Sequence, residues 1–281
     1  MVRTRISVVK YLNSVPLAWG ILEGPNRDHF EAVFSTPAEC ADQLASGAVD
    51  IGLIPSIEFQ RIRGSRIVPG PAIVSPRRAL SVFLLSLVPL FQVKTVGFDP
   101  ASRTSEALAR IIFGEFYRTR PEFRPAAPDP EEMLKNNDAA LLIGDAALRY
   151  RAGNRLPNAA SQGAYLRNGP EPVESFDLAE RWNNLTGLPF VFAFWAARAG
   201  FTDDKAHGRL LESRAFGLAH LDTIAARYAE TLGLDKDFLK SYLSSNLDYH
   251  MDAAGVEGLG LFYRLARKHG VLKSVRAIQF L

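Results

Sequence analysis

The sequence has few of the residues on which cysteine and histidine chemistry depends. Cys40 is the single cysteine among 281 residues, which excludes an internal disulfide framework and a metal site built from cysteines. None of the five histidines falls in a loop that follows a predicted strand, so we expect surface or structural roles for them. A histidine metal centre and a Ser-His-Asp triad therefore lack their parts. The G-x-S-x-G, P-loop and G-x-G-x-x-G motifs are absent as well.

The chain also lacks a strong charge of either sign and any long apolar run. Its net charge is +3 without a dense Lys/Arg block, which suits small anionic ligands better than nucleic acid. No apolar stretch reaches the ~20 residues that a membrane helix needs. The first apolar run is short and interrupted by Lys10, so it indicates a strand instead of a secretory signal. We expect a cytoplasmic protein that binds neither nucleic acid nor membranes.

What the sequence does contain is a repeated strand-loop-helix pattern. Strands are predicted at 5–10, 33–34 and 49–54. The capping box that begins at Thr36 opens a helix, and Gly47 ends it. Such repeats predict an α/β fold with a parallel sheet and helices on both of its faces.

A second α/β set lies between the two most strongly β-biased runs, 79–86 and 189–195. It contains strands at 96–98 and 139–143 with a helix after each, and a polar segment at 153–174 that we expect to be loop or edge hairpin. Beyond it, apolar residues from Leu210 to Ile224 predict one long helix. We therefore predict a two-lobed fold. The first lobe is discontinuous, formed by 1–90 and 190–281, and the second, 91–189, is inserted into it.

The loops that follow the strands are the predicted ligand site. In open α/β sheets ligands bind beyond the carboxyl ends of the strands, so loops 11–14, 55–58, 102–105 and 144–145 should meet in a cleft between the lobes. Loop 102–105 puts three hydroxyls and a guanidinium at a helix N-terminus, which predicts either an anion-binding site or an N-cap. The loops contribute mostly neutral hydrogen-bonding groups, which suit a polar, anionic small molecule.

Three residues keep two interpretations each. Asp145 either caps the following helix or acts as an acid or base in the cleft. Glu58 either begins a helix facing solvent or shares that acid-base role. The hydroxyl of Ser81, within a β-biased run, is either satisfied by backbone or directed at the cleft.

Five sequence motifs are more specific than the composition and the strand pattern. They are Y-L-N-S-V-P-L at 11–17, G-A-V-D-I-G-L-I-P-S-I-E-F at 47–59, S-R-T-S-E-A-L at 102–108, D-A-A-L-L-I-G-D at 138–145 and T-G-L-P-F-V-F-A-F-W at 186–195. With them the chain resembles the chorismate dehydratase family of the futalosine route to menaquinone, itself similar in fold to type II periplasmic binding proteins. The segment 153–174 carries no such likeness.

The resemblance implies a lyase that removes water from chorismate and gives 3-[(1-carboxyvinyl)oxy]benzoate, with no metal and no organic cofactor. It implies that Asn13 and Ser81 are catalytic. The residues it implies for substrate binding are Ser14, Pro55, Ser56, Ser102, Arg103, Thr104, Ser105, Gly144 and Asp145. The related second-step lyase has a histidine where this chain has Gly144-Asp145, which argues against the later pathway step.

Our mechanistic hypothesis takes the base from the substrate. The enolpyruvyl carboxylate, held by 102–105, would remove the ring proton while Asn13 and Ser81 bind the departing hydroxyl; alternatively Asp145 or Glu58 is the base. Three other functions compete with this one. They are an exported solute-binding protein for a small carboxylate, the effector domain of a transcription regulator, and a pathway lyase with another substrate.

Overall fold

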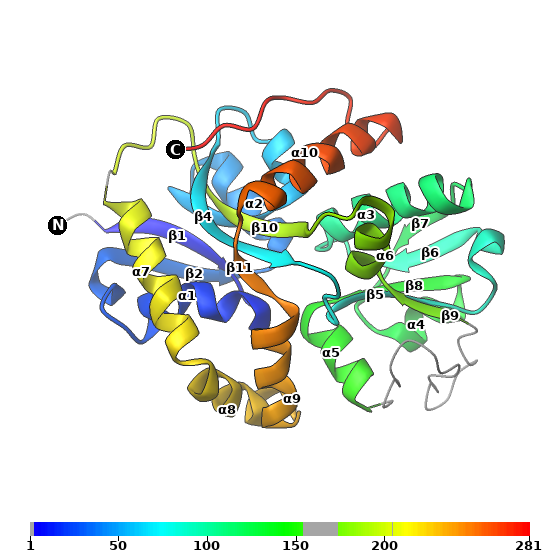
Figure 1. Ribbon diagram of the computed structural model, residues 1–281, viewed down its shortest axis with the longest axis horizontal. Helices are drawn as coiled ribbons and strands as arrows, with labels where there is room; N and C mark the ends of the chain where they lie inside the picture. Colours follow the sequence, from blue (N-terminus) through cyan, green and yellow to red (C-terminus); the bar gives the residue numbers. More distant parts are fainter. Residues whose placement is uncertain (1–2, 154–173, 204) are drawn as a thin grey trace.

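Two β-sheets lie side by side in the computed structural model, which describes residues 3–153, 174–203 and 205–281 (Figure 1). The first sheet has the order β11-β4-β10-β3-β1-β2 and the second β7-β6-β8-β5-β9. The strands of the first are β1 (Thr4–Val9), β2 (Phe30–Ser35), β3 (Ile51–Pro55), β4 (Arg66–Ser75), β10 (Phe190–Ala197) and β11 (Asp248–His250). Those of the second are β5 (Val82–Ser86), β6 (Thr95–Phe98), β7 (Glu122–Pro125), β8 (Ala139–Ile143) and β9 (Glu174–Asp177).

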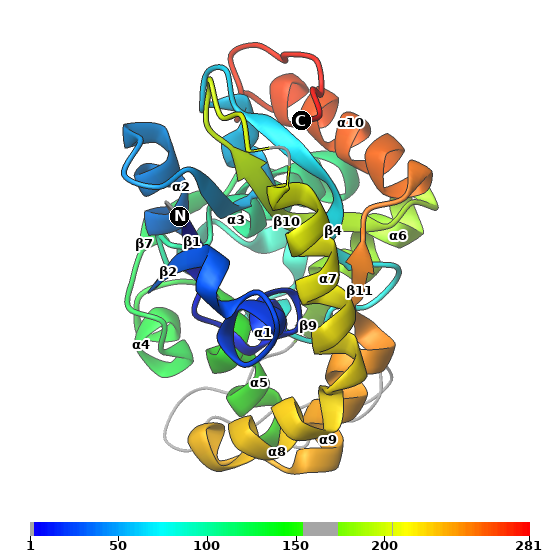
Figure 2. The same cartoon turned by 90° about the vertical axis from the view of Figure 1, so that its left-hand side faces the viewer.

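Helices cover both sheets. The described helices are α1 (Val15–Leu22), α2 (Pro37–Ser46), α3 (Arg103–Ile112), α4 (Pro130–Lys135), α5 (Gly144–Gly153), α6 (Leu178–Thr186), α7 (Ala206–Ala219), α8 (Leu221–Leu232), α9 (Lys236–Ser241) and α10 (Ala253–Lys268). Figure 2 shows α1 and α7 lying together on the first lobe, with α8 and α9 below them. A Cβ atom on Gly217 of α7 would lie within 1.9 Å of the Pro16 carbonyl oxygen, so glycine allows this close helix packing.

Several local predictions are confirmed. The side chain of Thr36 accepts a hydrogen bond from the Glu39 N–H, and the Glu39 carboxylate accepts one from the Thr36 N–H, which completes the predicted capping box. Gly47 ends α2 in the left-handed conformation at φ 75°. The predicted strands at 5–10, 96–98 and 139–143 correspond to β1, β6 and β8.

Other predictions were wrong. The single long helix is two helices, α7 and α8, which meet at His220. The first sheet is mixed: β1 is parallel to β2 and β3, but β10 runs antiparallel to both β3 and β4 because the chain returns to this sheet from the second lobe. Of the predicted polar segment 153–174, residues 154–173 lie outside the described part of the chain.

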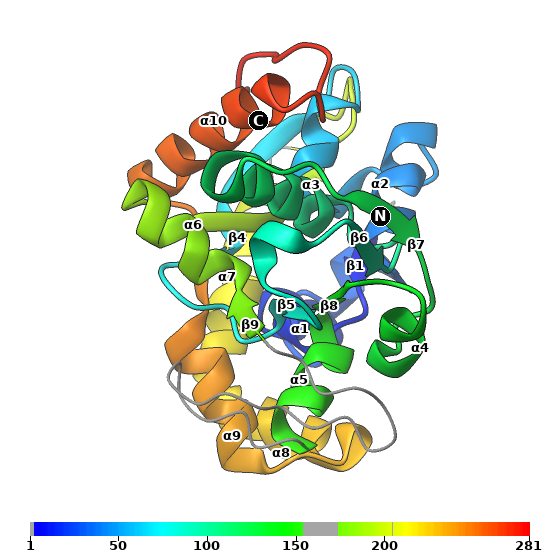
Figure 3. The same cartoon turned by 90° about the vertical axis from the view of Figure 1, so that its right-hand side faces the viewer.

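The strand predicted at 79–86 begins later than expected. The run expected to form a strand from residue 79 becomes β5 only at Val82, because Leu80 has φ +60°, a left-handed conformation that breaks the extended run. Strand β5 pairs with β8 and β9 in the second sheet (Figure 3). The lobe bounds of 1–90, 91–189 and 190–281 stay a prediction. The second sheet takes its strands from 82–177, and the first takes its strands from both sides of that segment.

The described helices include none with both the length and the apolar character needed to cross a bilayer. Within the same ranges, no group of three or more His, Cys, Asp or Glu side chains is arranged to hold a metal ion.

Candidate functional site

The strand-end loops of the two lobes meet around one cavity of about 490 Å³, including its opening to solvent. Its lining comes from both lobes: Val9, Tyr11, Asn13, Pro37, Pro55, Ile73, Val82, Ala101, Ser102, Arg103, Thr104, Ser105, Ile143, Gly144, Phe192 and Ala193. All four predicted loops contribute a residue. The structure therefore brings together Asn13, Pro55, Gly144 and the whole of 102–105, as the sequence predicted.

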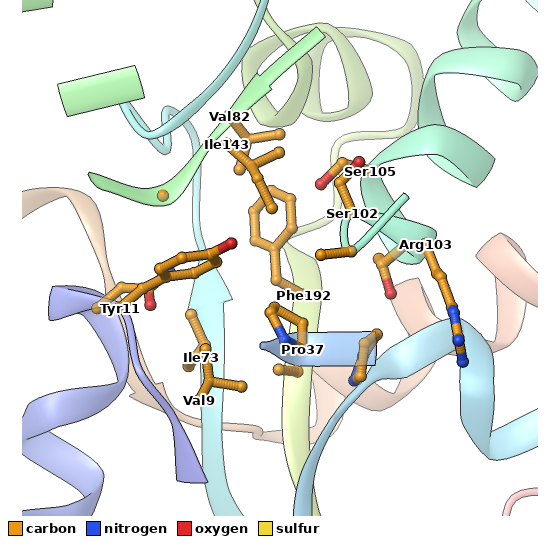
Figure 4. Close-up of a pocket in the computed structure, with 16 residues that line it drawn as sticks. Val9, Tyr11, Pro37, Ile73, Val82, Ser102, Arg103, Ser105, Ile143 and Phe192 are labelled. Carbon is orange, nitrogen blue, oxygen red and sulfur yellow. The ribbon is translucent and has the colours of Figure 1, made fainter. Parts of the chain in front are cut away.

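The walls of the cavity are largely apolar and its polar groups lie at the edges. In Figure 4 Val82 and Ile143 lie at the top of the cavity above Phe192, and Ser102 and Ser105 lie on the side opposite Tyr11. The ring of Tyr11 reaches in with its hydroxyl toward the interior (Figure 4). Burial, followed by the nearby Asp99, raises the pKa of Tyr11 well above its usual value, so this phenol stays protonated. Such a cavity suits a ring that carries polar groups at its ends.

The N-terminus of α3 is open toward the cavity. Ser102 occupies the N-cap position of α3, but its side chain does not cap the helix: its hydroxyl donates to the Asp99 carbonyl at 2.5 Å. The Ser105 hydroxyl has no hydrogen-bond partner among the residues that the structure describes. The first N–H groups of a helix have no intrahelical acceptor, so this end can bind an anion.

Arg103 does not have a free guanidinium, although it lines the cavity. It binds Asp42 at 2.8 and 2.9 Å and Glu58 at 3.2 Å, both in the first lobe. The hydrogen bond to Asp42 is the main cause that raises the pKa of Arg103 above its usual value. The side chain therefore links the two lobes at the cavity edge, and two carboxylates already offset its charge.

Two other hydroxyls also link the lobes. The Thr104 hydroxyl accepts a hydrogen bond from the Ile57 N–H at 3.2 Å and lies 3.5 Å from the hydroxyl of Ser56. Thr104 lines the cavity, whereas Ser56 lies behind it and is completely buried. The structure thus brings these two predicted binding residues together, and of the two only Thr104 lines the cavity.

Ser14 and Asp145 are predicted site residues that the structure places outside the cavity lining. The Ser14 hydroxyl is bound to the backbone carbonyls of Val9 and Tyr11, so it stabilises the loop that carries Asn13. The Asp145 carboxylate accepts a hydrogen bond at 3.0 Å from the Leu12 N–H in the other lobe. The cap interpretation of Asp145 is not met, because α5 already begins at Gly144; the acid-base interpretation stays a prediction. Burial raises the pKa of its carboxyl.

Ser81, one of the two residues predicted to be catalytic, has a partner that the sequence did not indicate. Ser81 lies just before β5, outside the cavity lining but next to the cavity-lining Val82, and its hydroxyl accepts a hydrogen bond at 2.8 Å from the phenol of Tyr242. Burial keeps the pKa of Tyr242 far above its usual value, although the nearby Ser81 and Asn13 side chains lower it. The carbonyl oxygen Oδ1 of Asn13 is buried with no partner in the described chain. A tyrosine on a helix carries no functional signal in the sequence by itself, so only the tertiary contact with Ser81 reveals Tyr242.

We expect Gly144→Ala to lower the free energy of unfolding, because Gly144 packs against Tyr11 in the wall of the cavity. Gly144 has φ +59°, and an added Cβ would lie 2.8 Å from the Tyr11 ring. The left-handed conformation costs an alanine ~1–2 kcal/mol and the overpacking ~1–3 kcal/mol more. Gly187→Ala is the matched control, since Gly187 has φ +72° and open space around it. Chemical denaturation of both variants measures the difference in the free energy of unfolding. Equal losses of stability would show that the Tyr11 ring moves away from the new Cβ at no cost.

Comparison with known proteins assigns the chain to a sequence family. Residues 4–268 match the sequence family described as menaquinone biosynthesis. Chorismate dehydratase of Thermus thermophilus is 32% identical over 261 residues, which cover 92% of this chain and 93% of that protein.

Solved structures show the fold. Protein AF1704 of Archaeoglobus fulgidus superposes with a TM-score of 0.73 at 16% identity, covering 96% of this chain and 98% of that one. The Candida albicans CA3427 gene product, described as having the generic periplasmic binding protein fold, gives 0.63 at 11% identity over 98% and 92%. The predicted two-lobed fold of this class is thus confirmed. Since the family match covers nearly the whole chain, this protein belongs to the menaquinone biosynthesis family.

Proposed function

We propose that this protein is a chorismate dehydratase, a carbon–oxygen lyase that removes water from chorismate and forms 3-[(1-carboxyvinyl)oxy]benzoate. The observation that carries the proposal is the 32% identity to a chorismate dehydratase along 92% of the chain. Chorismate is a small ring with two carboxylates and a hydroxyl. We place the reaction in the cytoplasm, where a biosynthetic enzyme of this kind would meet its substrate.

The cavity supports this substrate class. Its apolar walls can hold the ring, and the open N-terminus of α3 with the unpaired Ser105 hydroxyl can bind a carboxylate. An anion at a helix N-terminus gains ~0.3–1 kcal/mol from the dipole, besides the hydrogen bonds. The role proposed for 102–105 is therefore to hold the substrate carboxylate through N–H and hydroxyl groups, with Arg103 fixing the lobes around it.

Two side chains can form hydrogen bonds with the leaving hydroxyl, one as a donor and one as an acceptor. A substrate hydroxyl can donate one hydrogen bond and accept others. The Asn13 Oδ1 atom is a buried acceptor without a partner in the part of the chain that is described. The Ser81 hydroxyl accepts from Tyr242 and its own hydrogen has no acceptor within the same residues, which leaves it free to donate. We propose that Asn13 and Ser81 together bind the departing hydroxyl.

The base in this proposal is the enolpyruvyl carboxylate of chorismate itself. It would remove the ring proton, the C–O bond to the hydroxyl would break, and aromatisation of the ring would drive the loss of water. The alternative bases lie behind the cavity. Glu58 is bound by Arg61 at 2.5 Å and by Arg103 at 3.2 Å, and Asp145 by the Leu12 N–H.

We therefore expect Asp145→Asn and Glu58→Gln each to keep kcat within about threefold of wild type, because a base contributes ~10²–10⁴-fold and neither would be one. The asparagine can still accept from the Leu12 N–H, so the lobe contact is preserved. Steady-state kinetics with chorismate measures the effect. A loss of ~10²-fold in either folded variant would assign the base to that carboxyl and end the substrate-base mechanism.

The experiment that tests the function is incubation of the purified protein with chorismate in the presence of a chelator. We expect a product lighter by one water molecule with the absorbance of a substituted benzoate, followed by mass spectrometry and ultraviolet spectroscopy. Chorismate that binds, as measured by calorimetry, but is recovered unchanged would support a solute-binding protein instead. Chorismate that neither binds nor reacts would refute the substrate.

A further inference from the structure

We propose that Tyr242 is a positioning residue of this enzyme, which directs the hydroxyl hydrogen of Ser81 toward the substrate; the inference rests on the proposed function. Tyr242 is the first residue of a π-helical turn, η6 (Tyr242–Asn246), which continues α9. Its side chain is 1% exposed, and its phenol donates to the Ser81 hydroxyl at 2.8 Å. π-Helical turns inside helices occur frequently at functional sites.

The main chain around Ser81 is already fixed without Tyr242. The N–H groups of Ala79 and Leu80 donate to the buried Asp177 carboxylate at 3.2 and 2.7 Å, which holds Leu80 in its left-handed conformation. The Leu80 carbonyl accepts from the Arg151 guanidinium at 3.0 Å. The Ser81 carbonyl accepts from the Gly144 N–H at 2.8 Å. A non-glycine residue held at positive φ by several contacts is typical of functional sites.

The contacts described so far fix the main chain of Ser81 but not the rotation of its hydroxyl group. A serine hydroxyl has one hydrogen to donate and two lone pairs to accept. Because Tyr242 has no better acceptor in the described chain and donates to Ser81, the serine hydrogen is turned away from the phenol. The buried phenol keeps its proton, since burial raises the pKa of Tyr242. Tyr242 thereby leaves Ser81 as a donor, the role that the leaving hydroxyl requires.

The contact with Asn13 extends the arrangement to the second proposed catalytic residue. The Asn13 side chain lies close enough to the Tyr242 phenol to influence its pKa, and its Oδ1 atom has no partner among the described residues. The phenol thus donates to the residue that can donate to the substrate hydroxyl, and it lies near the residue that can accept from it. Networks of this kind hold polar side chains in one arrangement.

The test is Tyr242→Phe, which removes one oxygen atom and keeps the ring. We expect kcat for chorismate to fall about tenfold or more, at the low end of the effect of a positioned hydrogen-bond donor, with KM within about twofold of wild type. The matched control is Tyr249→Phe. Tyr249 is 2% exposed on β11 and its hydroxyl has no partner in the described ranges, so the same substitution should leave kcat within about twofold.

A double-mutant cycle separates positioning from packing. If Tyr242 acts through Ser81, then Tyr242→Phe added to Ser81→Ala should change kcat by less than about twofold, because the acceptor is already gone. A kcat for Tyr242→Phe within twofold of wild type overturns the proposal. So does a fall matched by Tyr249→Phe, or a full additional loss in the Ser81→Ala background. Wild-type enzyme that leaves chorismate unchanged refutes the proposed function instead, so the two failures are distinguishable.

Incorporation of 3-fluorotyrosine at position 242 keeps the test valid if Tyr242→Phe does not fold. This residue keeps the hydroxyl and nearly the same volume, and its more acidic phenol donates a stronger hydrogen bond to Ser81. The serine hydroxyl then becomes the better donor, and we expect kcat to rise. An unchanged or lower kcat would overturn the proposal.

Discussion

Replacing Asn13 by alanine is expected to lower kcat for chorismate dehydration by about 10²-fold or more. The amide lines the cavity, and its Oδ1 atom is a buried acceptor without a partner in the described chain, a condition that costs ~1–3 kcal/mol unless a ligand relieves it. The substitution removes the proposed acceptor of the leaving hydroxyl. Steady-state kinetics with chorismate, together with a thermal unfolding curve to show that the variant is folded, measures the effect.

Asn26→Ala is the matched control for this substitution. Asn26 is 2% exposed, and its amide donates to the Arg209 carbonyl at 3.2 Å and to the Glu212 carboxylate at 3.3 Å, away from the cavity. We expect it to lower stability by ~1 kcal/mol and to leave kcat within about twofold. Asn13→Ala with wild-type kcat would remove Asn13 from the catalytic proposal, whatever its effect on stability.

Replacing Ser81 by alanine is expected to cost a similar factor, about 10²-fold in kcat. The leaving hydroxyl would lose its proposed donor, and the buried phenol of Tyr242 would lose its acceptor. The backbone at this position should not move, since the bonds to Asp177 and Gly144 use main-chain atoms of the segment 79–81. The loss should therefore appear in kcat with little change in KM.

A buried serine elsewhere provides the comparison for Ser81→Ala. Ser213 on α7 is completely buried and its hydroxyl donates to the Leu17 carbonyl at 2.8 Å. Ser213→Ala likewise removes the one hydrogen bond of a buried serine hydroxyl, here one that the serine donates, and we expect it to leave kcat within about twofold. If both serine variants were slowed equally, the effect of Ser81→Ala would reflect packing and the proposed donor role would fall.

The position of the site could be predicted from the sequence because it follows from the ends of strands. The turns after β1, β3, β6 and β8 carry polar residues, and any sheet of this type gathers such turns at one edge. Asn13, Gly144 and the 102–105 loop were placed correctly in the cavity for this reason. The left-handed end of α2 at Gly47 likewise depends only on residues within a few positions.

The partners of individual side chains could not be predicted, because tertiary contacts decide them. Ser14 turns to the carbonyls of its own loop, and Asp145 reaches the backbone of the opposite lobe. Tyr242 is 161 positions from Ser81 in the chain, and its neighbours in sequence give no sign of a polar partner. Similarly, the strand expected from residue 79 is interrupted at Leu80 by the Asp177 carboxylate, which belongs to another strand end.

The pairing of Arg103 has a consequence for how fast the enzyme can exchange its substrate. If the lobes part, the buried Glu58 carboxylate keeps Arg61 as its partner at 2.5 Å, so no isolated charge is left in a dry environment. Arg103 would lose both its pair with Glu58 and its pair with Asp42, whose side chain is 63% exposed, and an exposed ion pair is worth ~0–1 kcal/mol. We therefore expect the Asp42 part of this link between the lobes to be weak and reversible.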